Sequence, residues 1–303
     1  VRTRCLRASL KPHRLHRSRA VNASVPHWTA PNNVSLLFPK DRFFLIAGPC
    51  VVEGDELNLA IARELQRLAP RVPGGIVFKA SFDKANRSNR GAARGPGVDA
   101  GLAALRRVKD TTGMPVITDV HLPSQCADAA EVADALQIPA FLCRQTDLLE
   151  AAGATGRAVN VKKGQWLHPE GMRGAVDKVR ASSGIANSEI AVTERGTFFG
   201  YGDLVVDMRS FERMRAATDC PAIFDATHSV QRPGLGDGGA SGGAREFIPP
   251  LALAAVAAGA NGVFLETHPD PDNAPSDGPN MLRLSDLEDL VNRLVAVWET
   301  VRR

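Results

Sequence analysis

Residues 75–81 read GIVFKAS, a short apolar run that ends in Lys79 and Ser81. Seven further runs have the same form, apolar at first and charged or polar at the end: FFLIAGPC (43–50), VITDVH (116–121), LQIPAFL (136–142), AVNVKK (158–163), EIAVTER (189–195), AIFDATH (222–228) and GVFLETH (262–268). Strands buried on both faces read as near-continuous apolar runs, and strands that alternate with helices pair in parallel. Eight such strands predict an α/β fold, a (β/α)8 TIM barrel.

Helical patterns lie between these runs, as the barrel requires. Apolar residues at three- and four-residue spacing predict helices over 55–69, 98–112, 124–135, 146–152, 170–182, 208–217, 245–258 and 285–301. A chain of 303 residues suits one barrel with an N-terminal basic extension. We therefore expect a leader over residues 1–40 and one catalytic domain over residues 41–303.

The basic charge of the chain is concentrated in the leader. Residues 1–40 hold eight Lys or Arg and no acid, so the remainder has a net charge of −4 although the whole chain has +4. A segment rich in Arg and Ser and free of acids is typical of a transit peptide, a disordered tail or a stretch translated from an upstream start. The distribution predicts no nucleic-acid partner, because the basic residues are not interleaved with aromatic ones.

Two further features place the chain among proteins of a reducing aqueous compartment. No apolar run approaches the roughly 20 residues that span a membrane, so we expect a soluble protein with no membrane partner. The five cysteines, Cys5, Cys50, Cys126, Cys143 and Cys220, include no CxxC pair and are odd in number. This spacing disfavours a disulfide framework and favours the cytoplasm.

Cations gather where the predicted strands end. Lys79, Lys84, Arg87, Arg90 and Arg94 follow the second strand, and Arg144, Lys162, Lys163 and Arg195 follow the fourth, fifth and sixth. In a TIM barrel the carboxyl ends of the strands form the catalytic face. So many cations at one face require a polyanionic ligand, such as two phosphates and a carboxylate. Arg90 and Arg94 fit equally well as solvated surface charges.

A second group of side chains follows the first, seventh and eighth strands. Cys50, His228, Glu266 and Asp277 can converge there, because the first and eighth strands are neighbours in a closed barrel. One thiolate, one imidazole and two carboxylates suit a divalent transition metal such as zinc, iron or manganese. A buried inert Cys50 and a structural His228 fit the spacing equally well.

Several long motifs carry a family resemblance from about Phe43 to the C-terminus. They are FKASFDKANRSNRGAARGPG, TDVH, PAFLCRQTDL, NVKKGQW, TERGTFFGYGDLVVD, FDATHSVQ, SGGAREF and ETHPDPDNAPSDGP. Together they closely resemble the 3-deoxy-D-manno-octulosonate 8-phosphate synthases, also called 2-dehydro-3-deoxyphosphooctonate aldolases. The resemblance implies a transferase that condenses phosphoenolpyruvate with D-arabinose 5-phosphate and water, without a Schiff base, to supply Kdo for lipopolysaccharide biosynthesis.

The resemblance also implies roles for individual residues. Catalytic roles fall on Lys79, Lys84, Asp119, His121, Lys162, Arg195 and His228, those of Asp119 and His121 being the least defined. The carboxylate side of the phosphoenolpyruvate site is Lys79, Ser81 and Lys84, and its phosphate side is Gln137, the backbone at Ala140, Lys162 and Arg195. The arabinose 5-phosphate site is Asn86, Arg87 and Ser88, joined by Arg144 from a neighbouring subunit.

The family divides into metal-dependent and metal-independent members at the position of Cys50, which is Asn in the latter. The Cys50 of this chain, with His228, Glu266 and Asp277 in matching motifs, places it with the metal-dependent members. The resemblance further implies a homotetramer in a bacterial cytoplasm, or plastid import if residues 1–40 are a transit peptide.

Two alternative functions stay open. The sister activity, 3-deoxy-D-arabino-heptulosonate 7-phosphate synthase, uses erythrose 4-phosphate and shares the barrel. Its members typically carry Lys-Pro-Arg-Thr where this chain has Lys84-Ala-Asn86-Arg87-Ser88. The other alternative is a noncatalytic barrel that binds sugar phosphates.

Overall fold

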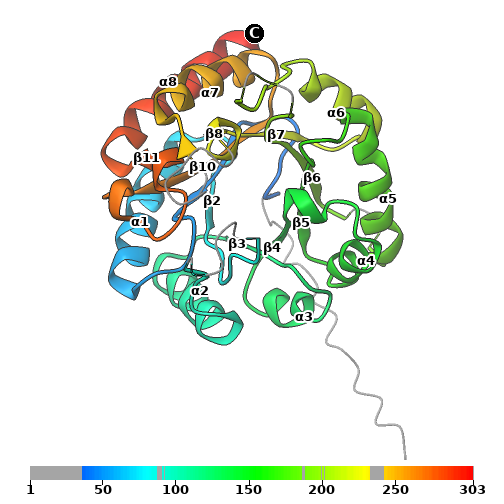
Figure 1. Ribbon diagram of the computed structural model, residues 1–303, viewed down its shortest axis with the longest axis horizontal. Helices are drawn as coiled ribbons and strands as arrows, with labels where there is room; N and C mark the ends of the chain where they lie inside the picture. The colour runs from blue at the N-terminus through cyan, green and yellow to red at the C-terminus, as the bar shows by residue number, and fades with distance from the viewer. Residues whose placement is uncertain are drawn as a thin grey trace, which may run out of the picture. The chain divides into compact units, whose positions relative to one another are not determined.

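A closed parallel barrel forms the centre of the protein (Figure 1). The computed structural model describes residues 36–86, 91, 93–185, 188–198, 200, 202–232 and 242–302. The barrel strands are β1 (Phe44–Gly48), β2 (Ile76–Lys79), β3 (Val116–Asp119), β4 (Ala135–Ile138), β5 (Ala158–Lys162), β6 (Ile190–Glu194), β7 (Ala222–Asp225) and β10 (Gly262–His268). Each strand pairs in parallel with the next, and β10 pairs with β1 from Phe44↔Gly262 to Gly48↔Glu266. The predicted (β/α)8 barrel is therefore confirmed.

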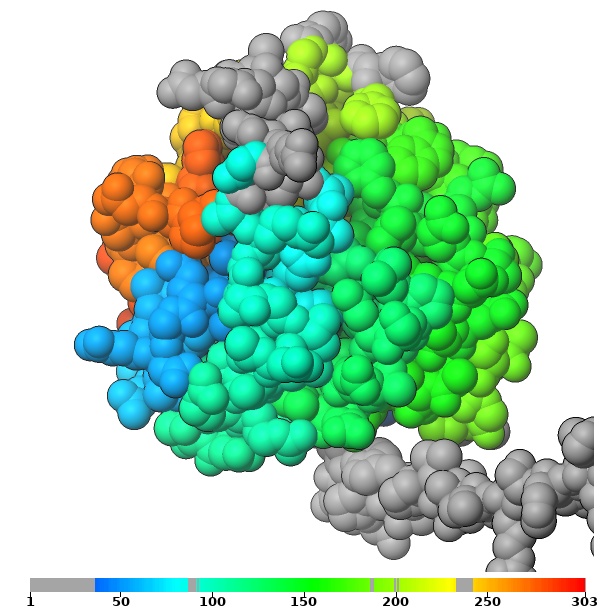
Figure 2. Space-filling model, turned by 60° about the horizontal axis from the view of Figure 1, so that its bottom comes forward, coloured from blue at the N-terminus to red at the C-terminus, as the bar shows by residue number. Residues whose placement is uncertain are grey.

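Helices cover the outside of the barrel. They are α1 (Asp55–Leu68), α2 (Val98–Thr112), α3 (Gln125–Ala130), α4 (Thr146–Ala154), α5 (Met172–Ser182), α6 (Ser210–Thr218), α7 (Ile248–Ala257) and α8 (Leu287–Val301). From α1 to α6 each helix contacts the next, and α7 contacts α8; in Figure 2 the regions of α1, α2 and α3 form a continuous surface from blue to green. None of the helices in the described ranges is long and apolar enough to cross a membrane.

Short strands and 3-10 helices complete the loops between the main elements. The strands β8 (Gln231–Arg232) and β9 (Gly242–Gly243) form an antiparallel pair, and β11 (Leu282–Arg283) pairs with the end of β10. The described 3-10 helices are η1 (Ala69–Arg71), η2 (Ala140–Leu142), η3 (Pro169–Gly171), η4 (His228–Val230), η6 (Arg245–Phe247), η7 (Pro271–Asn273), η8 (Gly278–Asn280) and η9 (Leu284–Asp286).

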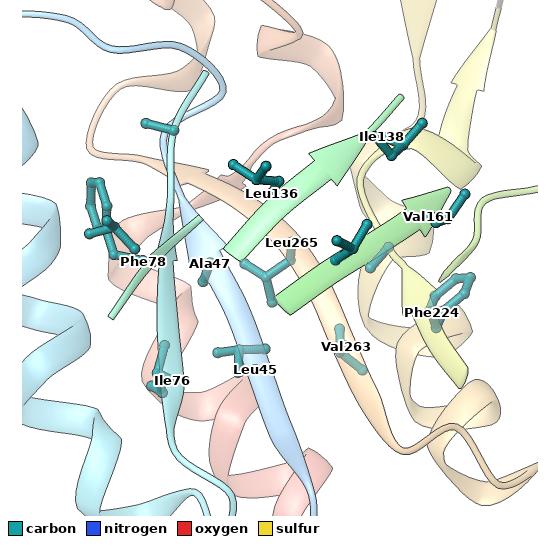
Figure 3. Close-up of a cluster of buried hydrophobic side chains, with 14 of the residues drawn as sticks. Leu45, Ala47, Ile76, Phe78, Leu136, Ile138, Val161, Phe224, Val263 and Leu265 are labelled. Carbon is teal, nitrogen blue, oxygen red and sulfur yellow. The ribbon is translucent and has the colours of Figure 1, made fainter. Parts of the chain in front are cut away.

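Two apolar layers hold these elements together. The outer layer packs the outward side chains of the strands against the helices; Leu45, Ala47, Val263 and Leu265 belong to it (Figure 3). The inner apolar layer fills the barrel with Phe38, Phe44, Ile46, Val77, Ile117, Ala135, Ala158, Ala191, Ile223 and Phe264. Because side chains alternate along a strand, the interior residues that follow this layer toward the carboxyl ends belong to the site described below.

Glycines permit two features of this packing. α2 ends at Gly113, which has a left-handed φ of 67° that a residue with a Cβ adopts only under strain. A Cβ at Gly48 would lie 2.1 Å from the carbonyl oxygen of Lys79, so β1 and β2 approach closely only because glycine stands there.

The eight predicted strands and the eight predicted helices are present, and the fourth strand and the third helix differ most from their expected bounds. The fourth strand ends at Ile138 instead of residue 142, since Pro139 has no N–H to continue the ladder and the chain turns into η2. The helix predicted over 124–135 is α-helical only from Gln125 to Ala130. The short pairs β8–β9 and β10–β11 were not expected from the sequence.

The end of the predicted leader packs against the amino-terminal end of the barrel. Residues 1–35 of that leader, with Cys5, lie outside the described residues. Phe38 is 2% exposed and packs on Phe44, with ring centroids 5.7 Å apart. The backbone N–H groups of Leu37 and Phe38 donate to the carboxylate of Glu189, and burial raises the pKa of that side chain.

Candidate active site

Buried charges of both signs line the barrel interior where the strands end. They are Lys79, Asp119, Lys162, Arg195, Asp225 and Glu266, none of them more than 7% exposed. Each lies at or next to the carboxyl end of a strand, which is the catalytic face of this fold. Buried charges are expensive unless they are paired. Groups of opposite sign are therefore expected to lie next to one another in this site.

A hydrogen-bonded network of amide and hydroxyl side chains leads to one of these charges, Asp119. The Thr193 hydroxyl donates to Asn160 Oδ1 (2.7 Å), and Asn160 Nδ2 donates to Gln137 Oε1 (2.9 Å). Gln137 Nε2 then donates to Asp119 Oδ1 at 2.7 Å. The network crosses β6, β5, β4 and β3 through the interior, and every donor in it has one acceptor. It fixes the orientation of Asp119, which lies three strands away from Thr193.

On the β2 side of the site, two lysines face two carboxylates. Lys79 Nζ donates to Glu266 Oε1 (2.8 Å) and lies 3.5 Å from Asp119 Oδ2. Lys84 Nζ lies 3.8 Å from Glu266 Oε1, and the Ser81 hydroxyl donates to Asp119. Burial alone would raise the pKa of Asp119, yet Lys79 and Lys84 hold it well below its usual range. Burial would likewise lower the pKa of Lys84, but the acidic groups around it raise that pKa overall.

On the opposite side, Asp225 joins Lys162 to His228. Its Oδ2 accepts from Lys162 Nζ at 2.7 Å and lies 2.8 Å from His228 Nδ1, while its Oδ1 accepts the backbone N–H of His228 at 2.9 Å. Burial lowers the pKa of Lys162, although Asp225 opposes that shift. Despite its burial, the pKa of Asp225 is held far below the usual range by His228 and Lys162. The Lys162 ammonium also lies 3.5 Å from the centre of the Phe264 ring.

Arg195 lies beside this pair and is 4% exposed. It donates to Gln231 Oε1 at 2.8 Å and to the carbonyl of His228. Its Nε has no hydrogen-bond partner among the described residues. Burial lowers its pKa. Lys162 and Arg195 are thus two buried cations that share one region of the barrel mouth.

Three of the four predicted metal ligands form a compact group. The ligand atoms of Cys50, Glu266 and Asp277 all lie within 4.8 Å of one another. The Cys50 thiol donates to Asp277 Oδ2 at 3.1 Å, and Glu266 Oε2 is buried without a hydrogen-bond partner among the described residues. His228 stands at the edge of the group, with its Nε2 3.9 Å from Glu266 Oε1.

The donor atoms of this group fit a divalent transition metal. Sulfur, imidazole nitrogen and carboxylate oxygen are the ligands that zinc and its neighbours accept. Because Asp225 contacts His228 Nδ1, His228 Nε2 is left to face the group, which is the usual arrangement of a metal-binding histidine. Burial and the nearby Glu266 raise the pKa of the Cys50 thiol well above its ordinary value. The thiol must therefore lose its proton when a metal binds.

The remaining predicted residues lie around the mouth. Gln137 and Ala140 are buried at and just beyond the end of β4, and His121 follows β3 with its pKa lowered by burial. Asn86 and Arg144 are exposed. The predicted pentose-site residues Arg87 and Ser88, together with Arg90, lie outside the described residues.

Sequence reasoning missed Asp225, Gln231 and Ser276. Asp225 ends the apolar run AIFD, and an acid inside such a run is the signal that could have identified it. Gln231 Nε2 donates to Asp277 Oδ1 at 2.8 Å, and the Ser276 hydroxyl donates to Asp277 Oδ2 at the same distance. Both are polar residues in loops, where sequence offers no comparable signal.

Comparison with known proteins agrees with this geometry. Residues 37–302 match the model of the DAHP synthetase I family. A 2-dehydro-3-deoxyphosphooctonate aldolase of Rhodopseudomonas palustris (strain BisB5) is 57% identical over 251 residues, which cover 83% of this chain and 86% of the relative. Relatives with the same name from Methylobacterium radiotolerans and Nitrobacter winogradskyi are 56% and 55% identical, and each alignment covers 86% of this chain and 90% of the relative. The chain therefore belongs to the DAHP synthetase I family, among the 2-dehydro-3-deoxyphosphooctonate aldolases.

Proposed function

We propose that this chain condenses phosphoenolpyruvate with D-arabinose 5-phosphate and water to give 3-deoxy-D-manno-octulosonate 8-phosphate and inorganic phosphate. One observation carries the proposal: four buried cations, Lys79, Lys84, Lys162 and Arg195, lie at the carboxyl ends of β2, β5 and β6, at one end of the barrel. A ligand with both a carboxylate and a phosphate would place one anionic group beside Lys79 and Lys84 and the other beside Lys162 and Arg195. The names of the relatives support the choice of substrates.

In the proposed reaction, C3 of phosphoenolpyruvate attacks the pentose aldehyde and water adds at C2. The resulting hemiketal phosphate then loses phosphate by cleavage of the C–O bond. Lys79 and Lys84 hold the carboxylate, and Lys162 and Arg195 hold the phosphate. Fixed cations of this kind stabilise charge as it develops and hold together two anions that would otherwise repel each other. The lysines act as ammonium groups, so no covalent bond forms to either.

Cys50, His228, Glu266 and Asp277 would hold a divalent metal ion, which we propose is zinc, iron or manganese. When bound, the ion supplies Lewis-acid chemistry that polarises water or an aldehyde oxygen. The chain itself contributes the orientation of His228 through Asp225 and the partly balanced charge of Glu266 next to Lys79. Metal analysis of the purified protein identifies the ion.

The exposed surface near Arg144 supports a subunit contact. Phe141 and Trp166 are 48% and 44% exposed, and their rings contact each other at a tilt of 38° with centroids 5.7 Å apart. Arg144 follows Phe141 by three residues. Exposed aromatic pairs of this kind often mark protein interfaces. We therefore propose a homotetramer in which Arg144 of one subunit reaches the arabinose 5-phosphate held by Asn86, Arg87 and Ser88 of another. Sedimentation measures the subunit number.

Residues 41–303 are the proposed catalytic domain and residues 1–40 its leader. We place the protein in a bacterial cytoplasm, with a plastid as the alternative if the leader is a transit peptide. The sister activity with erythrose 4-phosphate is not favoured, because the relatives carry the octonate name and residues 84–88 differ from Lys-Pro-Arg-Thr. A noncatalytic barrel would bind both substrates without turnover.

The deciding experiment measures phosphate release from phosphoenolpyruvate with arabinose 5-phosphate and, separately, with erythrose 4-phosphate. The protein is assayed as purified, after chelation, and with zinc, iron or manganese added back. We expect turnover with the pentose that chelation abolishes and metal restores. Preference for the tetrose would make this the sister enzyme, and full activity after chelation would overturn the metal assignment.

Two lysine variants make the assay specific to the mouth of the barrel. Lys162→Ala removes one cation of the proposed phosphate side, and we expect a large rise in the KM for phosphoenolpyruvate. Lys40→Ala is its control, because Lys40 pairs with Asp219 at the amino-terminal end of the barrel and is largely exposed. Equal effects of the two substitutions would contradict the proposed phosphate site.

A further inference from the structure

A buried ion pair lies on the outer side of the strands that carry the proposed phosphate site. Lys163 follows the last residue of β5, and Glu194 is the last residue of β6. Both are completely buried, and Lys163 Nζ lies 3.4 Å from Glu194 Oε1. Because successive side chains of a strand face opposite sides, Lys162 and Arg195 point into the barrel while Lys163 and Glu194 point outward.

The Lys163 ammonium joins two loops at the mouth of the barrel. It donates to the carbonyl oxygens of Gly164 (3.2 Å) and Leu167 (3.1 Å), in the loop after β5. It also lies 3.3 Å from the Thr197 hydroxyl, in the loop after β6. An ammonium has three N–H donors, so these contacts use all of them. The two loops are thereby held together at one point.

Glu194 fixes the chain on the other side of Arg195. Its Oε1 accepts the backbone N–H of Gly196 at 2.8 Å. Gly196 has a φ of 91°, a conformation that side chains other than glycine rarely adopt. Arg195 therefore lies between Glu194, whose carboxylate is buried, and Gly196, whose backbone has a positive φ. Both neighbours restrict the direction of the Arg195 side chain.

The stability of the fold does not by itself account for this pair. Desolvation of two ions costs several kcal/mol per ion, and well-packed apolar residues often replace a buried pair without loss of stability. The pair is, however, adjacent in sequence to both cations of the proposed phosphate side, one on each strand. A rigid link at this place sets the spacing between Lys162 and Arg195.

We propose that Lys163 and Glu194 are positioning residues that hold Lys162 and Arg195 at the separation required by the phosphate of phosphoenolpyruvate. The inference rests on the proposed function, because it assigns that phosphate to Lys162 and Arg195. Neither Lys163 nor Glu194 touches the substrate. Their effect falls on the binding of phosphoenolpyruvate and spares the pentose site.

The test compares a double variant of this pair with a double variant of a distant pair. Lys163→Met with Glu194→Gln removes both charges and keeps the side-chain sizes, so no lone buried charge is left. The control is Lys109→Met with Asp134→Asn, a partly buried pair (2.7 Å) at the amino-terminal end of the barrel. Steady-state kinetics give both KM values, calorimetry gives the Kd of phosphoenolpyruvate alone, and thermal unfolding gives Tm.

We expect the first double variant to raise the KM and Kd for phosphoenolpyruvate about tenfold or more, since small misplacements of binding groups have effects of this size. The KM for arabinose 5-phosphate stays within about twofold, and the control variant leaves both KM values unchanged. Wild-type affinity for phosphoenolpyruvate in the double variant would overturn the inference. An equal rise in both KM values would also overturn it, because a structural role alone predicts that result.

A milder variant covers the case in which the double variant does not fold. Thr197→Val removes one acceptor of Lys163 without changing a charge, and we expect a two- to fivefold rise in the KM for phosphoenolpyruvate alone. An unchanged KM in this variant would count against the inference. If the wild-type protein does not bind phosphoenolpyruvate, the proposed function itself is wrong. That failure is seen in the wild-type protein alone, so it is distinguishable from a failure of the inference about Lys163 and Glu194.

Discussion

Replacing Asp225 with asparagine removes the negative charge between Lys162 and His228. In the wild-type protein the carboxylate accepts from Lys162 Nζ (2.7 Å) and from the backbone N–H groups of His228 (2.9 Å) and Thr227 (3.2 Å). An asparagine keeps one oxygen for the backbone donors. Its NH2 group then stands in place of Oδ2, where it faces both Lys162 and the imidazole and does not restore the lost charge.

The size of the effect follows from burial. Asp225 is completely buried, and Lys162 is 5% exposed. Removing one partner of a buried pair typically costs about 3–5 kcal/mol, because it leaves the other charge uncompensated. For a domain of this size such a loss lowers Tm by roughly 6–20 °C. The imidazole also loses the carboxylate that orients it, and such a loss typically weakens metal binding about 10- to 100-fold.

Thermal unfolding and zinc titration measure the two effects, with Asp219→Asn as the control. Asp219 has the same side chain and also pairs with a lysine, Lys40 at 2.7 Å, but its side chain is 89% exposed. A surface pair of that kind is worth less than about 1 kcal/mol. If Asp225→Asn destabilises the protein no more than Asp219→Asn does, and binds zinc as tightly as the wild type, the account of the buried pair is wrong.

Three further predictions use other parts of the structure. Binding of zinc must remove the proton of the Cys50 thiol, whose pKa is raised, whereas the pKa values of the Glu266 and Asp277 carboxyls are already held low. The affinity for zinc, measured by competition with a chelator, should therefore rise about tenfold per pH unit near pH 7–8, because one proton is released. A zinc affinity that does not change with pH would contradict this. Burial raises the pKa of Glu189 above its ordinary value of 4.5, so the protonated side chain is favoured in the folded protein and stability is lost as pH rises through the raised pKa. Glu189→Gln does not titrate and should therefore gain Tm relative to wild type as pH rises above 4.5, and a constant difference would refute the sign. Gly48→Ala places a Cβ 2.1 Å from the Lys79 carbonyl oxygen and should cost about 3 kcal/mol in urea unfolding, whereas Gly174→Ala, with open space around it, should not destabilise α5.

The barrel could be predicted from the sequence because each strand is buried on both faces. That burial leaves an uninterrupted apolar run, and a charge at its end is then conspicuous. Lys79 and Arg195 are of this kind, and the structure places both at the mouth. Cys50 and Glu266 could be related because closure of the barrel makes β1 and β10 neighbours.

Features set by partners distant in the sequence could not be predicted. Asp225 acts on Lys162, which lies 63 positions away, and no local pattern links the two. Lys163 was grouped with Lys162 as a cation of the mouth, yet the structure turns it outward, toward Glu194. Strand alternation alone could have separated the two lysines, because adjacent residues cannot both face the interior.

The division of the barrel interior into an apolar and a charged part has a consequence for engineering. Ile117 and Ile223 of the inner apolar layer each stand two positions before a charged residue of the site, and the Phe264 ring of that layer has its centre 3.5 Å from the Lys162 ammonium. The apolar and charged parts of the interior are therefore in direct contact. A redesign that repacks the apolar part for heat resistance should keep Phe264, because its ring packs against a cation of the site.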